Sequence, residues 1–180
     1  EITDELLNGI DALVISGAFK PVNKSETMAI MRFLEGGGKL SVMLHIGPPM
    51  ADLLHTLDVS ISNGVLHETG DLVLKNDIDF KIRDLKVHEL TTDLKEFNIY
   101  GGWALLPTKE HTYAIAYTSE KAWIDLNGDK LADAQQKFAV VVVGAIGKGA
   151  FVVFSDDAIF QNNFLAEHNY SLGENLVRWF

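Results

Sequence analysis

The most regular spacing of metal-ligating residue types lies in residues 125–133. Aspartate or asparagine oxygens fall at the first, third, fifth and ninth positions, and the main-chain carbonyl of the seventh residue can add another. Calcium takes about six to eight oxygen ligands around a tight loop, so this spacing predicts a Ca2+ site that stabilises the loop. The predicted ligands are Asp125, Asn127, Asp129, Leu131 and Asp133.

Two positions of this loop differ from a helix-loop-helix calcium site. Lys130 occupies the sixth position, where such a site needs glycine, and Gln136 occupies the twelfth, where it needs a bidentate glutamate. An alternative interpretation is a surface turn in which Asn and Asp side chains bond to their own backbone. The sequence leaves both interpretations open.

A second group of polar residues follows the predicted central strands. Lys20, His45, Asp156 and Asp157 each lie in a loop that follows an apolar run. Doubly wound sheets bind ligands at the carboxyl ends of their strands, so these loops are expected to converge on one crevice. The two aspartates could act as acid and base, or hold a metal ion with the histidine. Alternatively, the aspartates cap a helix and the histidine is a packed, hydrogen-bonded side chain.

The other polar motifs do not indicate a site. The remaining histidines show no HxH or HxxxH spacing that would favour zinc. Residues 147–149, Gly-Lys-Gly, lack the Walker spacing and lie between two apolar runs, which favours a hairpin turn over a phosphate loop. The absence of cysteine excludes disulfides, thiolate metal sites and cysteine nucleophiles.

The elements that must position these groups are clearest in residues 11–46. An apolar run at residues 12–15 predicts a buried strand. Asn23 and Glu26 form a capping-box pattern at the start of an amphipathic helix, which three glycines end at residues 36–38. A second run at residues 40–46 is apolar apart from Ser41 and His45. A strand, crossover helix and strand of this length are expected to be parallel and right-handed.

The rest of the chain predicts shorter elements. Asn63-Gly64 within residues 59–66 is a hairpin signal, and residues 72–123 read as several short strands. Residues 138–146 and 150–154 are apolar on both sides of the Gly-Lys-Gly turn, which predicts a hairpin in the sheet centre. Residues 172–180 predict a final helix. The pattern as a whole favours an α/β fold with a mixed sheet between helices.

Length and composition narrow the classes of function. The chain has 180 residues, enough for one domain with a substantial core, and its 15 basic and 25 acidic residues give a net charge of −10. The basic residues are scattered, which argues against binding to nucleic acid. The longest apolar run, residues 138–146, is far shorter than the ~20 residues of a membrane helix, so no membrane insertion by this segment is expected. Because the chain opens on Glu1 and a short helical piece, we expect a fragment of a longer protein.

Three stretches together carry a resemblance to a known family. They are DALVISGAFKPVNKSETMAIMRFLEGGGKLSVML, VHELTTDLKEFNIYGG, and GKGAFVVFSDDAIFQNNFL with LGENLVRWF. The chain resembles the class I glutamine-amidotransferase-like domain in its non-catalytic branches. These include prokaryotic domains of unknown function and auxiliary proteins of gliding-motility-type ABC transporters, and an intraflagellar-transport domain is more distantly similar. Glu89 replaces a proline that the family usually has in the second stretch.

The resemblance implies a flavodoxin-like three-layer sandwich with a mainly parallel central sheet and a C-terminal β-hairpin. It also implies that residues 1–180 are a single domain that lacks the family's first strand-helix unit. The catalytic branches carry a cysteine on a tight turn that corresponds to residues 45–49, His-Ile-Gly-Pro-Pro. This turn has neither cysteine nor serine, so the chemistry of amidotransfer is excluded.

These observations favour a non-catalytic binding or scaffolding domain of a larger protein, expected to contact a protein partner or other domains of its own chain. Its compartment is not determined by the sequence, and an extracytoplasmic part of a membrane-associated protein is one expectation. Two alternatives stay open. One is a hydrolase that uses Asp156, Asp157 and His45, and the other is a calcium-stabilised extracellular module.

Overall fold

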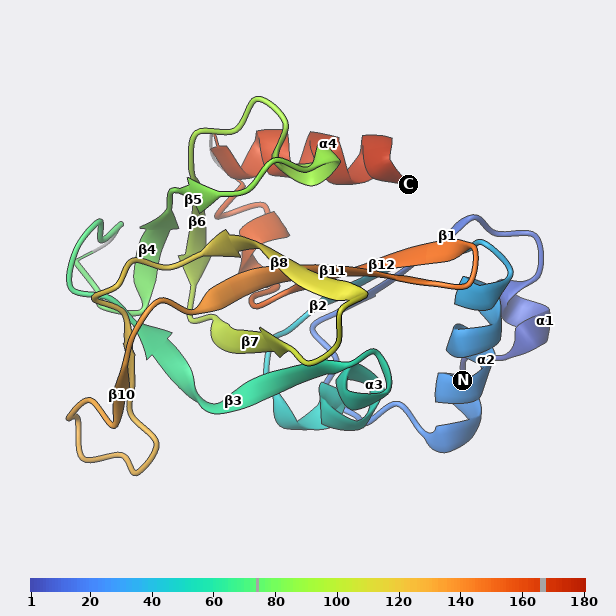
Figure 1. The fold of residues 1–180 in the computed structure, drawn as a ribbon, viewed down its shortest axis with the longest axis horizontal. Coiled ribbons are helices and arrows are strands. Elements are labelled where there is room, and N and C mark those ends of the chain that lie inside the picture. Colours follow the sequence, from blue (N-terminus) through green and yellow to red (C-terminus); the bar gives the residue numbers. More distant parts are fainter. Residues whose placement is uncertain (74, 166–167) are drawn as a thin grey trace.

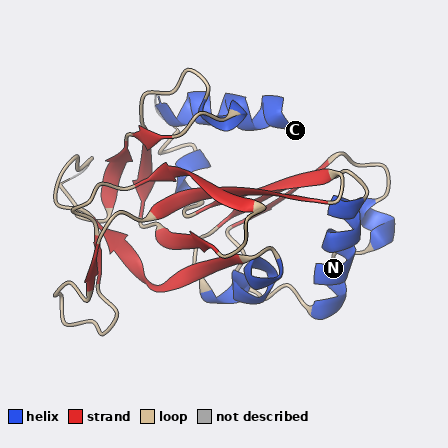
Figure 2. Cartoon of the chain, viewed as in Figure 1, coloured by secondary structure: helices blue, strands red, loops and turns tan. Residues whose placement is uncertain are grey.

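A ten-stranded mixed sheet forms the centre of the computed structural model, which describes residues 1–73, 75–165 and 168–180 (Figures 1 and 2). Its strands are β1 (Ala12–Ser16), β2 (Lys39–Met43), β3 (Val59–His67), β5 (Asp84–Leu85), β7 (Trp103–Pro107), β8 (Thr112–Tyr117), β9 (Trp123–Ile124), β10 (Ala134–Gln135), β11 (Ala139–Ile146) and β12 (Gly149–Phe154). A separate two-stranded sheet pairs β4 (Asp79–Ile82) with β6 (Phe97–Tyr100). The helices are α1 (Asp4–Leu7), α2 (Lys24–Glu35), α3 (Ala51–Thr56) and α4 (His168–Trp179), with 3-10 turns η1 (Pro48–Met50), η2 (Glu89–Thr91) and η3 (Ala158–Phe160).

The first strand-helix-strand unit forms as its local signals predict. The Asn23 side chain accepts the backbone N–H of Glu26 at 3.0 Å, and the Glu26 carboxylate accepts the N–H of Asn23 at 2.9 Å. This reciprocal capping box begins α2. Gly38 leaves no room for a side chain, because a Cβ there would lie 2.3 Å from the Phe33 ring. The β1 and β2 strands on either side of α2 pair in parallel, as predicted.

The predicted hairpin of β11 and β12 also forms, and it joins two kinds of sheet. The two strands pair antiparallel from Val141 with Phe154 to Ile146 with Gly149. On its other edge β12 pairs in parallel with β2. Strand β12 therefore marks the boundary between a parallel part of three strands and an antiparallel remainder.

The prediction of a flavodoxin-like, mainly parallel sandwich is wrong. Only the β1–β2 and β2–β12 pairs are parallel, and the other strand pairs of the described residues run antiparallel. The physical reason lies in residues 59–73 and 75–135, where the described connections between strands contain no long crossover helix. Strands joined by short loops pair antiparallel, because a parallel pair needs a crossover of a dozen or more residues.

The Asn63-Gly64 hairpin is a second wrong prediction, because β3 runs through these residues without turning back. A register irregularity separates the pairs of Ile61 and Val65 with β7. The Ser62 hydroxyl fills the irregularity by donating to the Gly64 carbonyl at 2.7 Å and accepting a backbone N–H at 3.0 Å. A Cβ on Gly64 would lie 2.6 Å from the Asp125 carbonyl oxygen, so this glycine permits a close backbone approach.

The two edges of β11 pair with different strands. The first edge pairs with β8. The opposite edge pairs with β12 over most of its length and with β7 at Ala139. A bond from the Trp103 N–H to the Ser155 carbonyl, 3.1 Å long, connects the start of β7 to the end of β12. The β7–β3 part of the sheet therefore begins where β12 ends.

Two hydrophobic cores lie on opposite faces of the sheet. One includes Leu40, Val42 and Phe151 and packs against α2 and α3. The other includes Met43 and Phe154 and packs against α4 and the β4–β6 pair. Figure 1 shows α4 and α3 on opposite sides of the strands. Side chains that alternate along β2 and β12 thus contribute to both cores, which explains why these strands are apolar at nearly every position, Lys39 and Ser41 of β2 being the exceptions. Within the described residues, no helix is long and apolar enough to cross a membrane.

Candidate functional site at the ends of the parallel strands

The three parallel strands end side by side, and short backbone bonds connect the loops that follow them. The Gly17 N–H donates to the Met43 carbonyl at 3.2 Å, and the Leu44 N–H donates to the Phe154 carbonyl at 3.1 Å. The Asp157 N–H donates to the Leu44 carbonyl at 2.8 Å. The structure therefore brings the loop after β12 next to the loop after β2, where the sequence placed a crevice.

His45 and Asp157 form a direct pair at these strand ends. The His45 Nδ1 lies 3.1 Å from the Asp157 Oδ1, and the histidine side chain is 45% exposed whereas the aspartate side chain is 11% exposed. A Cβ on Gly17, whose φ is +60°, would lie 2.8 Å from the Asp157 Oδ2. Glycine is required there by both its backbone conformation and the carboxylate against it. An aspartate that orients a half-exposed imidazole is an arrangement able to accept a proton from water.

Two aromatic side chains surround His45. The Phe19 ring centre lies 5.0 Å from the imidazole centre, and the Trp103 Nε1–H donates to the His45 carbonyl at 3.3 Å. Trp103 comes from β7, which is distant in sequence from the parallel unit. The sequence analysis placed neither aromatic residue in this site. The signal that could have indicated Trp103 is the glycine pair at residues 101–102 directly before it, since paired glycines permit a close approach.

Asp156 faces away from the pair and into the protein. Its Oδ2 accepts the Tyr100 N–H at 2.7 Å, its Oδ1 accepts the Ala158 N–H at 2.8 Å, and the residue is 3% exposed. Burial raises the pKa of this carboxyl to about 7, although the two backbone donors act in the opposite direction. Asp156 thus joins the end of β12 to β6 and η3, and both of its oxygens are already bonded.

The remaining polar groups at the strand ends do not complete a reactive set. Lys20 is exposed, and within the described ranges no hydrogen bond or ion pair links it to His45 or Asp157. Ser155 is fully buried, and its hydroxyl has no hydrogen-bond partner among the residues that the structure describes. A Cβ on Gly102 would lie 2.7 Å from this hydroxyl, so the serine packs closely against the β6–β7 turn.

Contrary to the calcium prediction, the described residues show no calcium site at residues 125–133. Asp125 accepts the backbone N–H groups of Gly128 at 2.7 Å and Lys130 at 2.8 Å, and Asp133 accepts that of Leu126 at 2.7 Å. These backbone bonds, with that of Lys130 the largest, lower the pKa of Asp125. Throughout the described part of the chain, no three His, Cys, Asp or Glu residues are grouped as a metal site. The alternative interpretation as a turn of Asx residues accounts for the loop.

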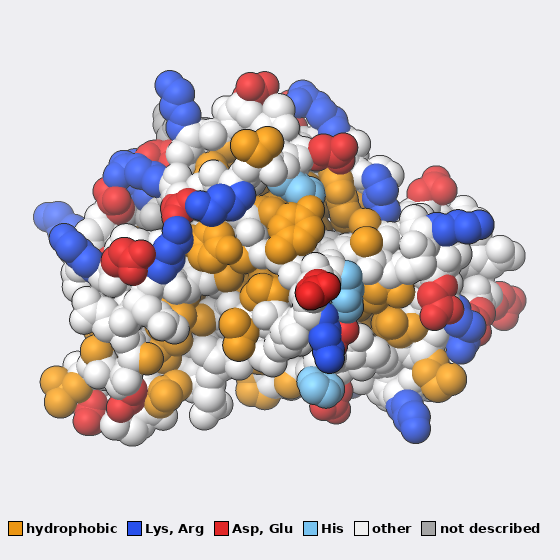
Figure 3. Space-filling view, viewed as in Figure 1, with side chains coloured by type: hydrophobic (Ala, Val, Ile, Leu, Met, Phe, Trp, Pro, Cys, Tyr) orange, Lys and Arg blue, Asp and Glu red, His pale blue; other side chains and the backbone are white. Residues whose placement is uncertain are grey.

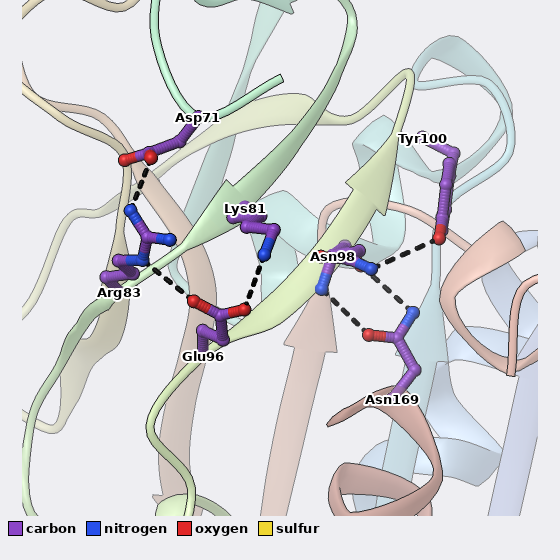
Figure 4. A network of polar contacts seen from close by, with 7 residues as sticks. All are labelled: Asp71, Lys81, Arg83, Glu96, Asn98, Tyr100 and Asn169. Atoms are coloured by element: carbon purple, nitrogen blue, oxygen red, sulfur yellow. Dashed lines mark hydrogen bonds and ion pairs between the residues drawn. The ribbon is translucent and has the colours of Figure 1, made fainter. Parts of the chain in front are cut away.

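A network of polar contacts fixes the β4–β6 pair (Figure 4). The Glu96 carboxylate accepts from Lys81 Nζ at 2.7 Å and from Arg83 Nε at 2.8 Å, and Arg83 also pairs with Asp71. The Lys81 and Arg83 bonds lower the pKa of Glu96 to about 2. This ion network lies at the start of β6, whereas Asp156 holds the end of the same strand.

The α4 helix is attached to the same strand by an amide side chain (Figure 4). Asn169 is fully buried, accepts the Asn98 N–H at 2.7 Å and donates to the Asn98 carbonyl at 3.1 Å. The side chain therefore pairs with β6 in the way that a neighbouring strand would. It gives α4 a fixed position over the sheet.

Two cavities have linings that include neither His45 nor Asp157. One of about 400 Å3 opens between β3, β7, β8 and the start of β11. Figure 3 shows hydrophobic side chains gathered at the centre of this face, and Leu106 and Tyr113 of β7 and β8 are 63% and 52% exposed. The other, of about 550 Å3, lies between β1 and α4. Exposed apolar side chains thus occur at this face as well as beside His45, where Phe19 is 70% exposed.

No protein-family model and no curated protein matches the sequence. Solved structures do match over nearly the whole chain. The mmIFT52 N-terminal domain is 18% identical, with a TM-score of 0.78, and the match covers 99% of this chain and 80% of that one. A cytoplasmic protein from Salmonella typhimurium LT2 is 17% identical, with a TM-score of 0.65 and coverage of 99% and 75%. A protein described as ThuA-like from Bacteroides uniformis is 14% identical, with a TM-score of 0.61 and coverage of 98% and 71%.

These similarities are at the level of the fold alone, because identities below 20% carry no argument about activity. They do not test the resemblance to glutamine-amidotransferase-like domains, which stays a prediction from the sequence.

Proposed function

We propose that this chain is a non-catalytic domain that binds or positions another polypeptide within a larger assembly. The observation that carries the proposal is the hydrogen bonding of the buried Asp156 side chain. Both carboxylate oxygens of this residue hold backbone amides of the protein itself, at 2.7 and 2.8 Å. A buried carboxylate that satisfies backbone donors is a structural group, and the His45–Asp157 pair is then left without the second acid that acid-base hydrolysis needs.

The turn after β2 supports the same proposal. A nucleophile at such a turn has to project from a sharp bend between strand and helix. Here the bend contains His45, Ile46 and Gly47, and the following 3-10 turn begins with Pro48. None of these side chains is a hydroxyl or thiol nucleophile.

The proposal is tested with chromogenic esters, phosphate esters and glycosides, assayed with the wild-type chain and with His45→Ala. We expect turnover at the level of buffer for every substrate and no difference between the two proteins. A turnover above buffer that falls at least about tenfold in His45→Ala contradicts the proposal, because it assigns a chemical step to the imidazole.

The second candidate function is a hydrolase, and the contact between His45 and Asp157 favours it. In that function Asp157 orients the imidazole through Nδ1, and the other ring nitrogen takes a proton from the attacking water. Asp157→Asn keeps the shape of the pair but removes the charge. If any turnover is found, this function requires a loss in Asp157→Asn and a pH profile that changes with the substitution.

A further inference from the structure

The β1 strand is an edge of the sheet with unpaired backbone groups. The Asp11 carbonyl and the Gly17 N–H both bond to β2, so the alternate residues 11, 13, 15 and 17 face that strand. The N–H and carbonyl groups of Ala12, Val14 and Ser16 therefore point outward. Among the described residues, no hydrogen bond to these three backbones is found.

This edge lacks the features that normally prevent strand pairing. The β1 sequence, Ala-Leu-Val-Ile-Ser, contains no charged residue and no proline, and its register with β2 is regular. Natural edge strands are usually protected by charges, prolines, bulges or a covering element. Val14, at the centre of the strand, is 47% exposed. An apolar, regular edge of this kind is suited to accept a further strand.

An apolar groove lies next to this edge on the α4 face of the sheet. The cavity of about 550 Å3 is bounded by Val14, Met43 and Phe160 on one side and by Tyr170, Val177 and Phe180 of the C-terminal segment on the other. Val177 is 72% exposed and Tyr170 is 55% exposed, although both belong to the helix that covers this face. A strand added beside β1 would direct every second side chain towards this groove.

We propose that β1 and α4 form a strand-addition site for an extended segment of a partner protein. The inference rests on the proposed binding function and specifies where and what the domain binds. The segment pairs its backbone with Ala12, Val14 and Ser16 and places alternate apolar side chains in the groove beside Val177. Main-chain bonds give the affinity in this mode of recognition, and the side-chain pockets give the specificity.

The size and charge of the site favour a partner segment over a second copy of the chain. Five strand residues extend only about 17 Å, whereas a stable dimer buries about 20–30 residues on each side. Two copies that each carry a net charge of −10 also repel each other. The same charge favours a segment with basic residues on either side of its apolar positions.

The probe is a synthetic peptide, acetyl-Lys-Val-Thr-Val-Thr-Val-Lys-amide, titrated into the isotope-labelled chain. Backbone amide spectra are expected to shift at residues 12, 14 and 16, and the amides of Ala12, Val14 and Ser16 are expected to gain protection from solvent exchange. Two control peptides carry backbone N-methyl groups, one at the valines and one at the threonines. One of these controls is expected to lose binding and the other to keep it, because only alternate N–H groups face β1.

Two substitutions in the site and one outside it complete the test. Val14→Lys and Val177→Lys are each expected to weaken peptide binding at least about tenfold, since they place a positive charge in the groove that receives the apolar side chains of the peptide. Leu106→Lys is the matched control, because it changes a similarly exposed apolar residue on β7. It is expected to leave the affinity unchanged. Thermal unfolding of each variant confirms that it is folded.

Several results would overturn the proposal. One is the absence of any shift at the β1 amides at about 1 mM peptide, and another is an equal loss of binding in Leu106→Lys. A concentration-dependent dimer that Val14→Lys abolishes would assign the edge to a second copy. A longer form of the polypeptide that no longer binds the peptide would assign the edge to an intramolecular strand. None of these results concerns turnover, so the non-catalytic function stands or falls separately.

Discussion

Two carboxylates hold the two ends of β6, and their surroundings have opposite effects on their acidity. Glu96 lies before the strand and bonds to Lys81 and Arg83, and its pKa is lowered to about 2. Asp156 bonds to the last residue of the strand, and burial raises its pKa to about 7. Cations that remain partly in water favour the charged form of Glu96. At Asp156 the two backbone N–H bonds favour the charged form less than the loss of water disfavours it, so the pKa is raised.

The difference indicates which end of β6 is important for stability. Ion pairs between partly exposed groups contribute little, because water and salt screen them. A buried acceptor that satisfies two backbone donors is costly to remove, because both donors then lose their partner. The end of β6 at Tyr100 is therefore expected to be the more sensitive one, although the network at Glu96 contains more charges.

The largest expected effect comes from Asp156→Ala. The substitution leaves the N–H groups of Tyr100 and Ala158 without their acceptor, at an expected cost of about 3–5 kcal/mol in the free energy of unfolding at pH 5. Urea unfolding measures the loss. Glu96→Ala provides the comparison and is expected to cost about 1–2 kcal/mol. Equal losses in the two variants would remove the distinction between the two ends.

The second effect is a pH dependence that Asp156→Asn should remove. The pKa of Asp156 is higher in the folded chain than its ordinary value of 3.8, so its contribution to stability is present below that value and is lost as pH rises through about 7. Between pH 5 and pH 8 the wild type is expected to lose about 2–3 kcal/mol relative to Asp156→Asn, because the amide does not ionise. Urea unfolding at both pH values gives the two differences. Parallel pH profiles would show that Asp156 is ionised throughout this range.

The smallest effect is expected from Glu96→Gln. Because the pKa of Glu96 is lowered on folding, its contribution is present above the ordinary value of 4.5 and is lost as pH falls through about 2. At pH 7 the substitution is expected to cost about 1 kcal/mol in low salt and less in about 1 M salt. Glu120→Gln, in an exposed turn, serves as the control for the change of charge. A loss that does not respond to salt would indicate packing as its origin.

The sequence predicted elements well where the signals were local. The capping box of Asn23 and Glu26 and the glycines after α2 determine one short stretch of backbone, and the structure contains them as predicted. The arrangement of the sheet depends on contacts between distant residues, and there the prediction failed. Asn63-Gly64 is a typical hairpin-turn sequence. In the structure, however, the missing side chain of Gly64 allows the carbonyl of residue 125 to lie close to β3. Local spacing cannot distinguish these two uses of glycine.

The same limit applies to the candidate site. The order of the apolar runs predicted that His45 and Asp157 would lie at neighbouring strand ends. In the structure the His45 Nδ1 and the Asp157 Oδ1 are 3.1 Å apart. The same order could not predict that the adjacent Asp156 would face the opposite direction, because that depends on β6, which pairs with β4 in a separate sheet. In residues 125–133 the spacing suited a cation and a turn equally. In the structure, the Asp125 oxygens accept backbone N–H groups of the loop itself, as in a turn built from Asx residues.

The position of β12 between two kinds of sheet has a consequence for the order of folding. Its pairing with β11 closes through the short turn at residues 147–148, so this contact costs little chain entropy and can form early. Its pairing with β2 joins segments over 100 residues apart in sequence and must await the rest of the chain. The hairpin would then act as a template on which the N-terminal unit assembles last. Refolding, more than unfolding, should therefore be sensitive to side chains in the turn between β11 and β12.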